Sequence, residues 1–469
     1  MDIYPIVDMM AGWARGYPFI LLLLGSAIYI TIRLRGIQFR KTGQAFHYLV
    51  GQSDDQQGRG EVSNFGAMAT VLSGTIGTGN IAGVATAITL GGPGAIFWMW
   101  VTALFGMALK YACCLLGHHF RRVDARGEIA GGPMYTLKYG LNMPKLGAFF
   151  AIATLLAGAT TGGMVQSHSV VDGIIYVIPQ AEEWRFVMGC LIAFFVGIVI
   201  LGGVQRIATV ASIVVPFMAI AYCGSALVIL LVNYAEVPGA FLTIFNYALN
   251  PWSAGAGMLG AAIQFGVLRA LFASEAGLGT APIALAATKT NFCVRAGLIG
   301  MIGPWFDTML ICTMTALVII IAGFYGENIP AGLVGASLSA AAFEQGLSNA
   351  FGHAAGVVGA VIVGAGLVFF AYTTIIAWAY YGDRATQYLL GPKAVLPFRL
   401  AFIALTLVGA ISSLEMVWGL ADIANVLMAV PNIISLLLLS GMVKKATDDY
   451  FNDKTHLVPE ADCVNPPAE

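Results

Sequence analysis

The sequence predicts an all-α, polytopic membrane protein with about eleven transmembrane helices, and three observations support this fold class. Of the 469 residues, 58% are hydrophobic and only 10% are charged, whereas soluble proteins carry roughly 25% charged residues. The apolar stretches are long and nearly free of charge, and about 20 such residues cross a bilayer as a helix. A membrane β-barrel would show alternating segments of about ten residues, and the sequence has no such pattern.

The apolar spans separate the basic residues. We expect spans at 17–33, 64–90, 94–117, 147–172, 185–204, 207–232, 257–286, 297–322, 355–381, 397–412 and 417–441. Of the 23 lysines and arginines, 19 follow an odd-numbered span, and loops rich in these residues stay cytoplasmic. The sequence therefore predicts a multi-pass protein of the bacterial inner membrane, with the N-terminus outside and the C-terminus in the cytoplasm.

The same pattern divides the chain into five parts. These are an N-terminal transmembrane helix with a cytoplasmic loop (1–63), a first five-helix repeat (64–232), an extracellular interfacial segment (233–256), a second five-helix repeat (257–441) and a cytoplasmic tail (442–469). The tail is polar and contains three prolines, a composition typical of disorder.

Two spans carry glycine clusters near their middle. One contains Ser73–Asn80 (SGTIGTGN) and the other contains Phe272–Gly279 (FASEAGLG). Three glycines within six residues destabilise a helix interior by about 3 kcal/mol relative to alanine. Irregular backbone at membrane depth is tolerated only where it is buried in protein or lines a cavity. We therefore expect both helices to break at these clusters.

The two clusters occupy corresponding positions. One lies in the span that opens the first set of five helices, and the other in the span that opens the second set. Because five is odd, the second set runs through the membrane in the opposite direction. Such a pair of interrupted helices points to a transporter site, where free N–H groups meet a carboxylate and free carbonyl groups meet a cation. The alternative is that the small residues only allow close helix packing.

Four motifs carry a resemblance to a known family. They are Ser73–Gly83 (SGTIGTGNIAG), Gly91–Trp100 (GGPGAIFWMW), Gly131–Tyr135 (GGPMY) and Leu271–Pro282 (LFASEAGLGTAP). On these residues the chain resembles the alanine or glycine:cation symporter family of the amino acid–polyamine–organocation superfamily. The resemblance implies a leucine-transporter-type fold of two inverted five-helix repeats, preceded here by one extra N-terminal helix. It also implies sodium-coupled symport of a small neutral amino acid, alanine or glycine, by alternating access.

The resemblance implies a substrate site between the two breaks. The N–H groups of Thr78 and Gly79 would bind the substrate carboxylate, with the Asn80 side chain close by. Carbonyl groups around the second break would accept from the substrate ammonium, and an aromatic ring would bound the pocket. The second-break residues in this set are Phe272, Ser274, Ala276 and Gly277.

Two further side chains are candidates with an open alternative. The amide of Gln166 either donates to the substrate carboxylate or makes a hydrogen bond between helices. Trp378 forms either a wall of the pocket or an ordinary packing contact.

The resemblance implies a sodium site beside the first break. The carbonyl of Phe370 lies on the same helix face as the hydroxyls of Thr373 and Thr374. Carbonyl groups of Ser73 and Ile76 would complete five oxygen ligands. The alternative is that the threonines bond to carbonyls one turn earlier in their own helix.

Ionisable residues inside a membrane are functional candidates by default. We expect a fixed charge network between Arg269 and either Glu275 or Asp307. Lys110 and His118 lie towards a cytoplasmic end of their span, where snorkelling to the membrane surface explains them.

Other classes of function fit the sequence less well. There is no phosphate-binding Gly-xxxx-Gly-Lys-Ser/Thr loop, and a net charge of −1 gives no argument for nucleic-acid binding. We expect no enzyme activity and no cofactor apart from sodium as the coupling ion. The expected partners are the amino acid, sodium and the lipid bilayer, without nucleotide or nucleic acid. A proton-coupled amino-acid carrier on the same fold is the alternative.

Overall fold

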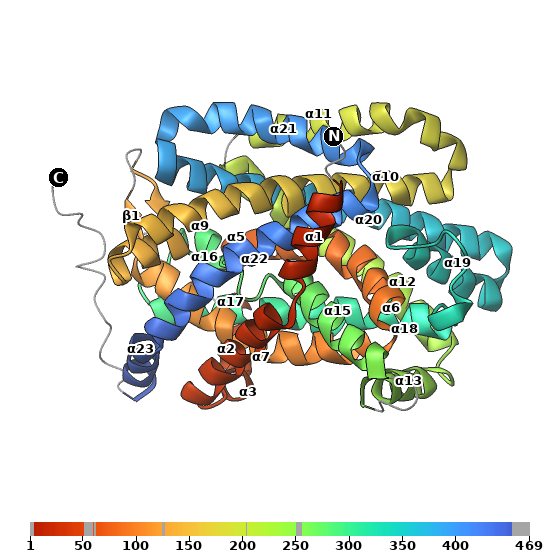
Figure 1. The fold of residues 1–469 in the computed structure, drawn as a ribbon, viewed down its shortest axis with the longest axis horizontal. Coiled ribbons are helices and arrows are strands. Elements are labelled where there is room, and N and C mark those ends of the chain that lie inside the picture. Colours follow the sequence, from red (N-terminus) through yellow and green to blue (C-terminus); the bar gives the residue numbers. More distant parts are fainter. Residues whose placement is uncertain are drawn as a thin grey trace.

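The computed structural model describes residues 4–50, 60, 62–123, 127–202, 204–249 and 256–452, and these residues form a helical bundle (Figure 1). From the N-terminus its helices are α1 (Tyr4–Ala14), α2 (Tyr17–Arg33), α3 (Ile37–Arg40), α4 (Thr42–Val50), α5 (Asn64–Thr75), η1 (Thr78–Asn80), α6 (Ala82–Gly91), α7 (Gly94–His119), α8 (Pro133–Tyr135), η2 (Thr136–Gly140), α9 (Pro144–Ala157), η3 (Gly158–Met164), α10 (Val165–Val177), η4 (Pro179–Trp184), α11 (Arg185–Ile200) and α12 (Val204–Val232).

The second half of the chain continues in the same way. Its helices are α13 (Val237–Leu249), α15 (Ala256–Ser274), α16 (Ala281–Leu285), α17 (Cys293–Met301), η5 (Trp305–Cys312), α18 (Thr313–Ile321), η6 (Gly326–Asn328), α19 (Ala336–Phe351), α20 (His353–Leu390), η7 (Pro392–Ala394), α21 (Val395–Ile411), α22 (Leu414–Leu438) and α23 (Ser440–Asn452). A short antiparallel pair, β1 (Arg122–Val123) and β2 (Ile129–Ala130), places Arg122 opposite Ala130.

Nine helical segments of the described residues are long and apolar enough to cross a membrane. This all-helical architecture agrees with a polytopic membrane protein. The expected spans 64–90 and 257–286 are not among the nine, because each is divided into shorter helices. The count of eleven spans and the two inverted repeats stay predictions.

The structure confirms that both glycine clusters interrupt their helices. In the first break, α5 ends at Thr75, Gly77 is extended at φ −136° and ψ −158°, and α6 begins at Ala82. In the second break, α15 ends at Ser274 and α16 begins at Ala281. Left-handed backbone occurs there at Glu275 (φ 52°) and at two glycines, which adopt it without the steric cost that a Cβ atom imposes.

Two wide helical turns border the breaks. Residues of η3 and η5 are hydrogen-bonded with π-helical spacing, which often occurs at functional sites. They present Thr161 and Asp307, respectively, to the protein interior. Hydropathy alone did not predict these turns, because the hydrogen-bond spacing within a helix leaves its apolar pattern nearly unchanged.

Different elements lie at the two ends of the bundle. In Figure 1, α13 and α19 lie at one end, whereas α23 and β1 lie at the opposite end. The expected extracellular interval 233–256 contains the helix α13.

The prediction of a disordered tail from residue 442 is wrong for its first part. Helix α23 continues to Asn452, because it docks on the bundle. Its Thr447 hydroxyl shares a 2.7 Å hydrogen bond with Tyr111, and Tyr450 lies 3.0 Å from the hydroxyl of Tyr48. Residues from 453 onward lie outside the described part of the chain.

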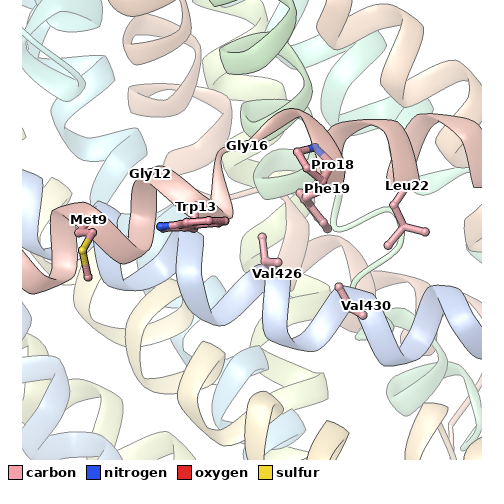
Figure 2. Close-up of a pocket in the computed structure, with 9 residues that line it drawn as sticks. All are labelled: Met9, Gly12, Trp13, Gly16, Pro18, Phe19, Leu22, Val426 and Val430. Carbon is pink, nitrogen blue, oxygen red and sulfur yellow. The ribbon is translucent and has the colours of Figure 1, made fainter.

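The outer surface is apolar, as expected for helices facing lipid. Large exposed side chains include Trp13 (83%) and Ile220 (74%). Figure 2 shows an apolar groove where α1 and α2 cross α22, lined by Trp13, Phe19 and Val426 among others. The groove contains none of the predicted site residues.

Candidate functional site

The first break is held open by side chains rather than by a helical ladder. The amide of Gly77 donates to Asn80 Oδ1 at 3.0 Å, and the amide of Thr78 donates to Gln166 Oε1 at 3.1 Å. Asn80 N and Ile81 N bond to carbonyls within the break. Of the amides of residues 77–81, only that of Gly79 has no partner among the described residues. It is therefore a donor available to a ligand.

Asn80 ties the first break to the neighbouring π-helical turn. Its Nδ2 donates to the carbonyl of Asp307 at 2.8 Å and lies 3.4 Å from Cys312 Sγ. The side chain is fully buried. Both ends of the amide are thus used, one to cap the break and the other to hold η5.

Gln166 makes the hydrogen bond between helices that was one of its two expected roles. Its Oε1 accepts from both the amide and the hydroxyl of Thr78, and its Nε2 donates to the carbonyl of Thr161 at 3.1 Å. In this arrangement the amide of Thr78, which we expected to bind the substrate carboxylate, is already hydrogen-bonded to Gln166.

In the second break, two of the expected carbonyl acceptors already have donors. The carbonyl of Ser274 accepts from Lys110 Nζ at 2.7 Å, and that of Gly277 accepts from Asn432 Nδ2 at 2.8 Å. The amide of Ala276 donates to Ser274 Oγ at 3.3 Å. Lys110 and Asn432, which sequence reasoning did not place in the site, therefore define the shape of this break.

The two breaks approach each other at Gly79. A Cβ atom at this position would lie 2.7 Å from Cδ1 of Phe272 and 3.3 Å from Cα of Ala273. The ring of Phe272 in turn packs on Trp418, with ring centroids 4.6 Å apart. The predicted aromatic wall is thus in contact with the first break, and only glycine fits between them.

Three of the five predicted sodium ligands converge. The hydroxyl of Thr374 donates to the carbonyls of Ser73 at 3.0 Å and Ile76 at 3.4 Å. The other two ligands, Phe370 and Thr373, are bonded to each other. Thr373 Oγ1 donates to the carbonyl of Phe370 at 3.0 Å and to that of Phe369 at 3.2 Å, which is the own-helix bonding expected as the alternative.

Trp378 packs against the opposite side of the second break. A Cβ atom at Gly162 of η3 would lie 2.3 Å from Trp378 Cβ, so the two helices are in close contact. The indole hydrogen-bonds to Glu275, which also accepts from the hydroxyl of Thr280. Trp378 therefore combines a packing role with a polar contact to the break.

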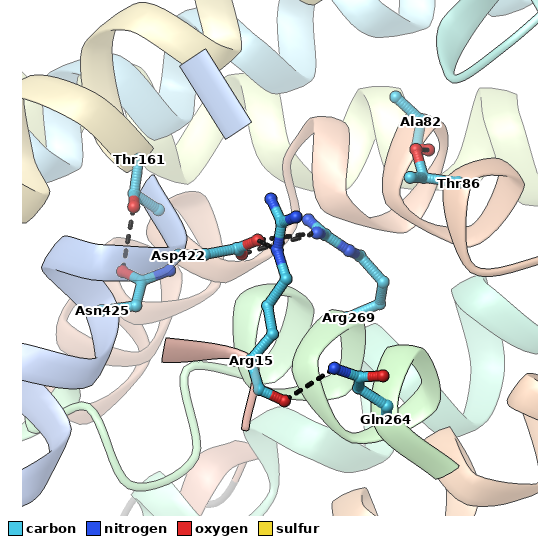
Figure 3. Close-up of polar contacts among 8 residues, drawn as sticks. All are labelled: Arg15, Ala82, Thr86, Thr161, Gln264, Arg269, Asp422 and Asn425. Carbon is cyan, nitrogen blue, oxygen red and sulfur yellow. Dashed lines mark hydrogen bonds and ion pairs between the residues drawn. The ribbon is translucent and has the colours of Figure 1, made fainter. Parts of the chain in front are cut away.

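The expected charge network of Arg269 is wrong in its partner. Arg269 Nη2 lies 3.2 Å from Asp422 Oδ2, and Arg15 Nε lies 2.8 Å from the same carboxylate (Figure 3). Arg269 also lies over the ring of Trp418 at 4.1 Å. Six residues separate Arg269 from Glu275, so on a helix they face different directions, and α22 supplies the acid instead. The signal was available, because Asp422 is also an acid within an expected span.

The expected snorkelling of Lys110 and His118 is also wrong. Both side chains are only 2% exposed, and Lys110 turns inward to the carbonyl of Ser274. A helix end is accessible to solvent only if neighbouring helices leave it uncovered, and here α15 and α17 pack along α7.

The site is closed on all sides in this conformation. The predicted site side chains are at most 5% exposed, from Ser73 (0%) to Phe272 (5%). A second apolar pocket, lined by Val170, Phe195 and Tyr372 among others, contains none of them. In this conformation the predicted site residues are thus enclosed between the two broken helices.

Two helices broken halfway through an apolar bundle, with polar groups converging between them, define a membrane transporter. The family model described as "Sodium:alanine symporter family" matches residues 2–461. The chain belongs to this family, whose members are cation-coupled amino-acid symporters.

Three relatives show the extent of the similarity. The chain is 45% identical to "Sodium/alanine symporter AgcS" of Methanococcus maripaludis, over 96% of this chain and 98% of that protein. It is 35% identical to "Putative sodium/proton-dependent alanine carrier protein YrbD" of Bacillus subtilis, over 93% and 90% of the two chains. It is 34% identical to "Probable sodium/glutamine symporter GlnT" of Bacillus subtilis, over 93% and 88%.

The role of Gln166 leads to a first prediction. In Gln166→Leu, the amide and hydroxyl of Thr78 lose their common acceptor inside the protein, and such buried groups cost about 1–3 kcal/mol when unpaired. We expect the alanine concentration for half-maximal uptake to rise about tenfold. Gln345→Leu on α19 is the matched control, because the amide of Gln345 donates to the carbonyl of Ala322 and not to the break. Equal uptake by the two variants would contradict a role for Gln166 at the break.

Proposed function

We propose that this protein is a sodium-coupled symporter of a small neutral amino acid, alanine or glycine, that works by alternating access in the bacterial inner membrane. The N-terminus would lie outside and the C-terminus in the cytoplasm. The observation that carries this proposal is the meeting of the Thr374 hydroxyl with the carbonyls of Ser73 and Ile76. Alkali cations prefer such hard oxygen ligands.

The helix ends make this position favourable for a cation. Helix α5 stops at Thr75, so its last carbonyl groups lie beside Thr374 without partners from a continuing helix. The negative end of the helix dipole adds to their attraction. Sodium bound here would link α5 to α20 and so stabilise one arrangement of the first break.

The amino acid would lie between the breaks. Its carboxylate would meet the amide of Gly79, and its ammonium group would face the carbonyls of the second break. The close contact of Gly79 with Phe272, backed by Trp418, leaves little width there. This supports a small side chain on the substrate.

A proton-coupled carrier is the second candidate. Three buried ionisable groups, Lys110, Glu275 and Asp307, lie around the second break. One relative carries both ions in its name, "Putative sodium/proton-dependent alanine carrier protein YrbD". These observations favour protons as the alternative coupling ion.

Uptake of labelled alanine into proteoliposomes tests the proposal. An inward sodium gradient is expected to drive uptake at constant pH, and a pH gradient without sodium is not. A potential of 100 mV, negative inside, should increase uptake, because it supplies about 2.3 kcal/mol per translocated charge. Uptake that is unchanged without sodium would overturn the sodium coupling and favour the proton.

Thr374→Val provides the second prediction. The substitution keeps the shape of the side chain but removes the hydroxyl that meets Ser73 and Ile76. We expect the sodium concentration for half-maximal uptake to rise about tenfold or more. Thr406→Val on α21 is the control, because among the described residues that buried hydroxyl donates to the carbonyl of Phe402 in its own helix. If both variants keep the sodium dependence of the original protein, the site lies elsewhere.

A further inference from the structure

Lys110 places an ammonium group inside the second break. Its Nζ lies 2.7 Å from the carbonyl of Ser274, and the side chain is 2% exposed within the candidate span Gly94–His119, nine residues before its end. A charge buried at this depth is costly unless it is paired. In this structure the partner of Lys110 is the carbonyl of Ser274.

The carbonyl that Lys110 contacts is the end of a helix. Ser274 is the last residue of α15, and Glu275 follows in left-handed conformation. The carbonyl end of a helix carries roughly half a negative charge, which attracts a cation. Lys110 supplies that cation from the neighbouring helix α7.

Two carboxyl groups add to the negative charge. Glu275 follows Ser274 directly, and Asp307 lies one turn after Gly303, whose position approaches Lys110 closely. A Cβ atom at Gly303 would lie 2.8 Å from Nζ. The Oδ2 atom of Asp307 is buried and has no hydrogen-bond partner among the described residues.

The two breaks differ in the donor that the carbonyl groups at the helix end accept from. At the end of α5, the carbonyls of Ser73 and Ile76 meet the neutral hydroxyl of Thr374, which leaves a cation to be supplied from solution. At the end of α15, the carbonyl of Ser274 meets an ammonium group that belongs to the chain. Asn80 connects the two regions, because its Nδ2 donates to the carbonyl of Asp307.

From this contrast we propose that Lys110 is the resident cation of the second break, and that the carrier therefore couples each amino acid to a single sodium ion. The inference rests on the proposed sodium symport. The ammonium group takes the place that a mobile cation would otherwise occupy between Ser274, Glu275 and Asp307. The number of coupling ions is then set by a side chain of α7.

Two substitutions of Lys110 separate charge from space. Lys110→Ala removes the charge and leaves room beside Ser274, Glu275 and Asp307, so a second sodium ion is expected to enter. The Hill coefficient for sodium activation of uptake should rise from about 1 to about 2. Lys110→Met removes the charge but fills the space. Uptake is therefore expected to fall about 100-fold or more, although the variant still folds. Lys393→Ala on η7 is the control and should behave like the original protein.

The decisive measurement is the ratio of sodium to alanine entering proteoliposomes, from ²²Na and labelled alanine in parallel. One sodium ion per alanine in the original protein and two in Lys110→Ala support the proposal. Two per alanine in the original protein, or an unchanged ratio and Hill coefficient in Lys110→Ala, overturn it. If Lys110→Ala does not fold, the ratio in the original protein decides. Uptake by the original protein without any sodium dependence would instead refute the proposed symport itself.

Discussion

Gly77→Ala is expected to reduce sodium-dependent alanine uptake by about 10- to 100-fold. A Cβ atom at this position would lie 2.5 Å from the hydroxyl oxygen of Thr374 and 3.1 Å from Gln166 Oε1. One methyl group would thus displace Thr374 from the carbonyls of Ser73 and Ile76, and Gln166 from Thr78. Overpacking of a closed interior costs about 1–3 kcal/mol, and here the groups that must move are those proposed to bind sodium.

The matched control is Gly83→Ala in the following helix, α6. A Cβ atom there has a single neighbour within 4 Å, Trp418 at 3.7 Å, which is an ordinary contact. We expect its uptake and sodium dependence to stay within about twofold of the original protein. Sodium activation curves of both variants in proteoliposomes make the comparison. Gly77→Ala that transports as well as Gly83→Ala would show that the first break is not the sodium site.

Of the substitutions proposed for this protein, Asp422→Asn is expected to cause the largest loss of folding stability. Its carboxylate is shared by Arg269, at 1% exposure, and by Arg15, at 22% exposure. Arg269 Nε and Nη1 have no hydrogen-bond partner among the described residues, so this guanidinium depends on Asp422. Removing one partner of a buried ion pair costs about 3–5 kcal/mol. The midpoint of thermal unfolding in detergent should therefore fall by several degrees.

Arg15, Arg269 and Asp422 join separate parts of the bundle. Figure 3 shows Arg15, from the segment after α1, and Arg269, from α15, converging on Asp422 of α22, while the carbonyl of Arg15 accepts from Gln264 at 2.9 Å. Loss of Asp422 should thus also lower uptake, because Arg269 lies over Trp418. Asp449→Asn on the exposed face of α23 is the control for loss of one carboxylate. Equal unfolding midpoints for the two variants would refute the structural role of the pair.

Arg15→Gln gives a graded comparison within the same network. This side chain is partly exposed, so water replaces much of what its loss removes. Its effect on the unfolding midpoint should be clearly smaller than that of Asp422→Asn. The order of the two effects separates a buried charge requirement from a surface contact.

Some contacts of the candidate site were predicted from the sequence, and others were missed. The contact of Thr374 with Ser73 and Ile76 joins residues about 300 positions apart, with separations of 301 and 298, and it was expected only because of the family resemblance. The positions of Thr78, Gly79, Asn80 and Phe272 at facing breaks were expected in the same way. Trp418, Asn432 and Lys110 were missed, because an apolar or polar residue within a span carries no local sign of the helix that it contacts.

The features that could be predicted from composition and spacing are local. The scarcity of charge, the lengths of the apolar runs and the glycine clusters at 73–80 and 272–279 concern neighbouring residues, and the energy of a backbone segment in lipid depends mainly on those neighbours. The membrane class, the two breaks and the segregation of basic loops therefore followed from composition and spacing alone.

The packing of segments far apart in the sequence sets which buried groups are paired. Arg269 selects Asp422 at a separation of 153 residues, and Lys110 selects the carbonyl of Ser274 at a separation of 164. A buried charge must find a partner, but several partners satisfy that requirement, and the packing of α7, α15 and α22 chooses among them. For the same reason the hydrophobic pattern of α7 marked Lys110 only as an unusual residue. The packing of α15 beside α7 is what places Lys110 at the carbonyl end of α15.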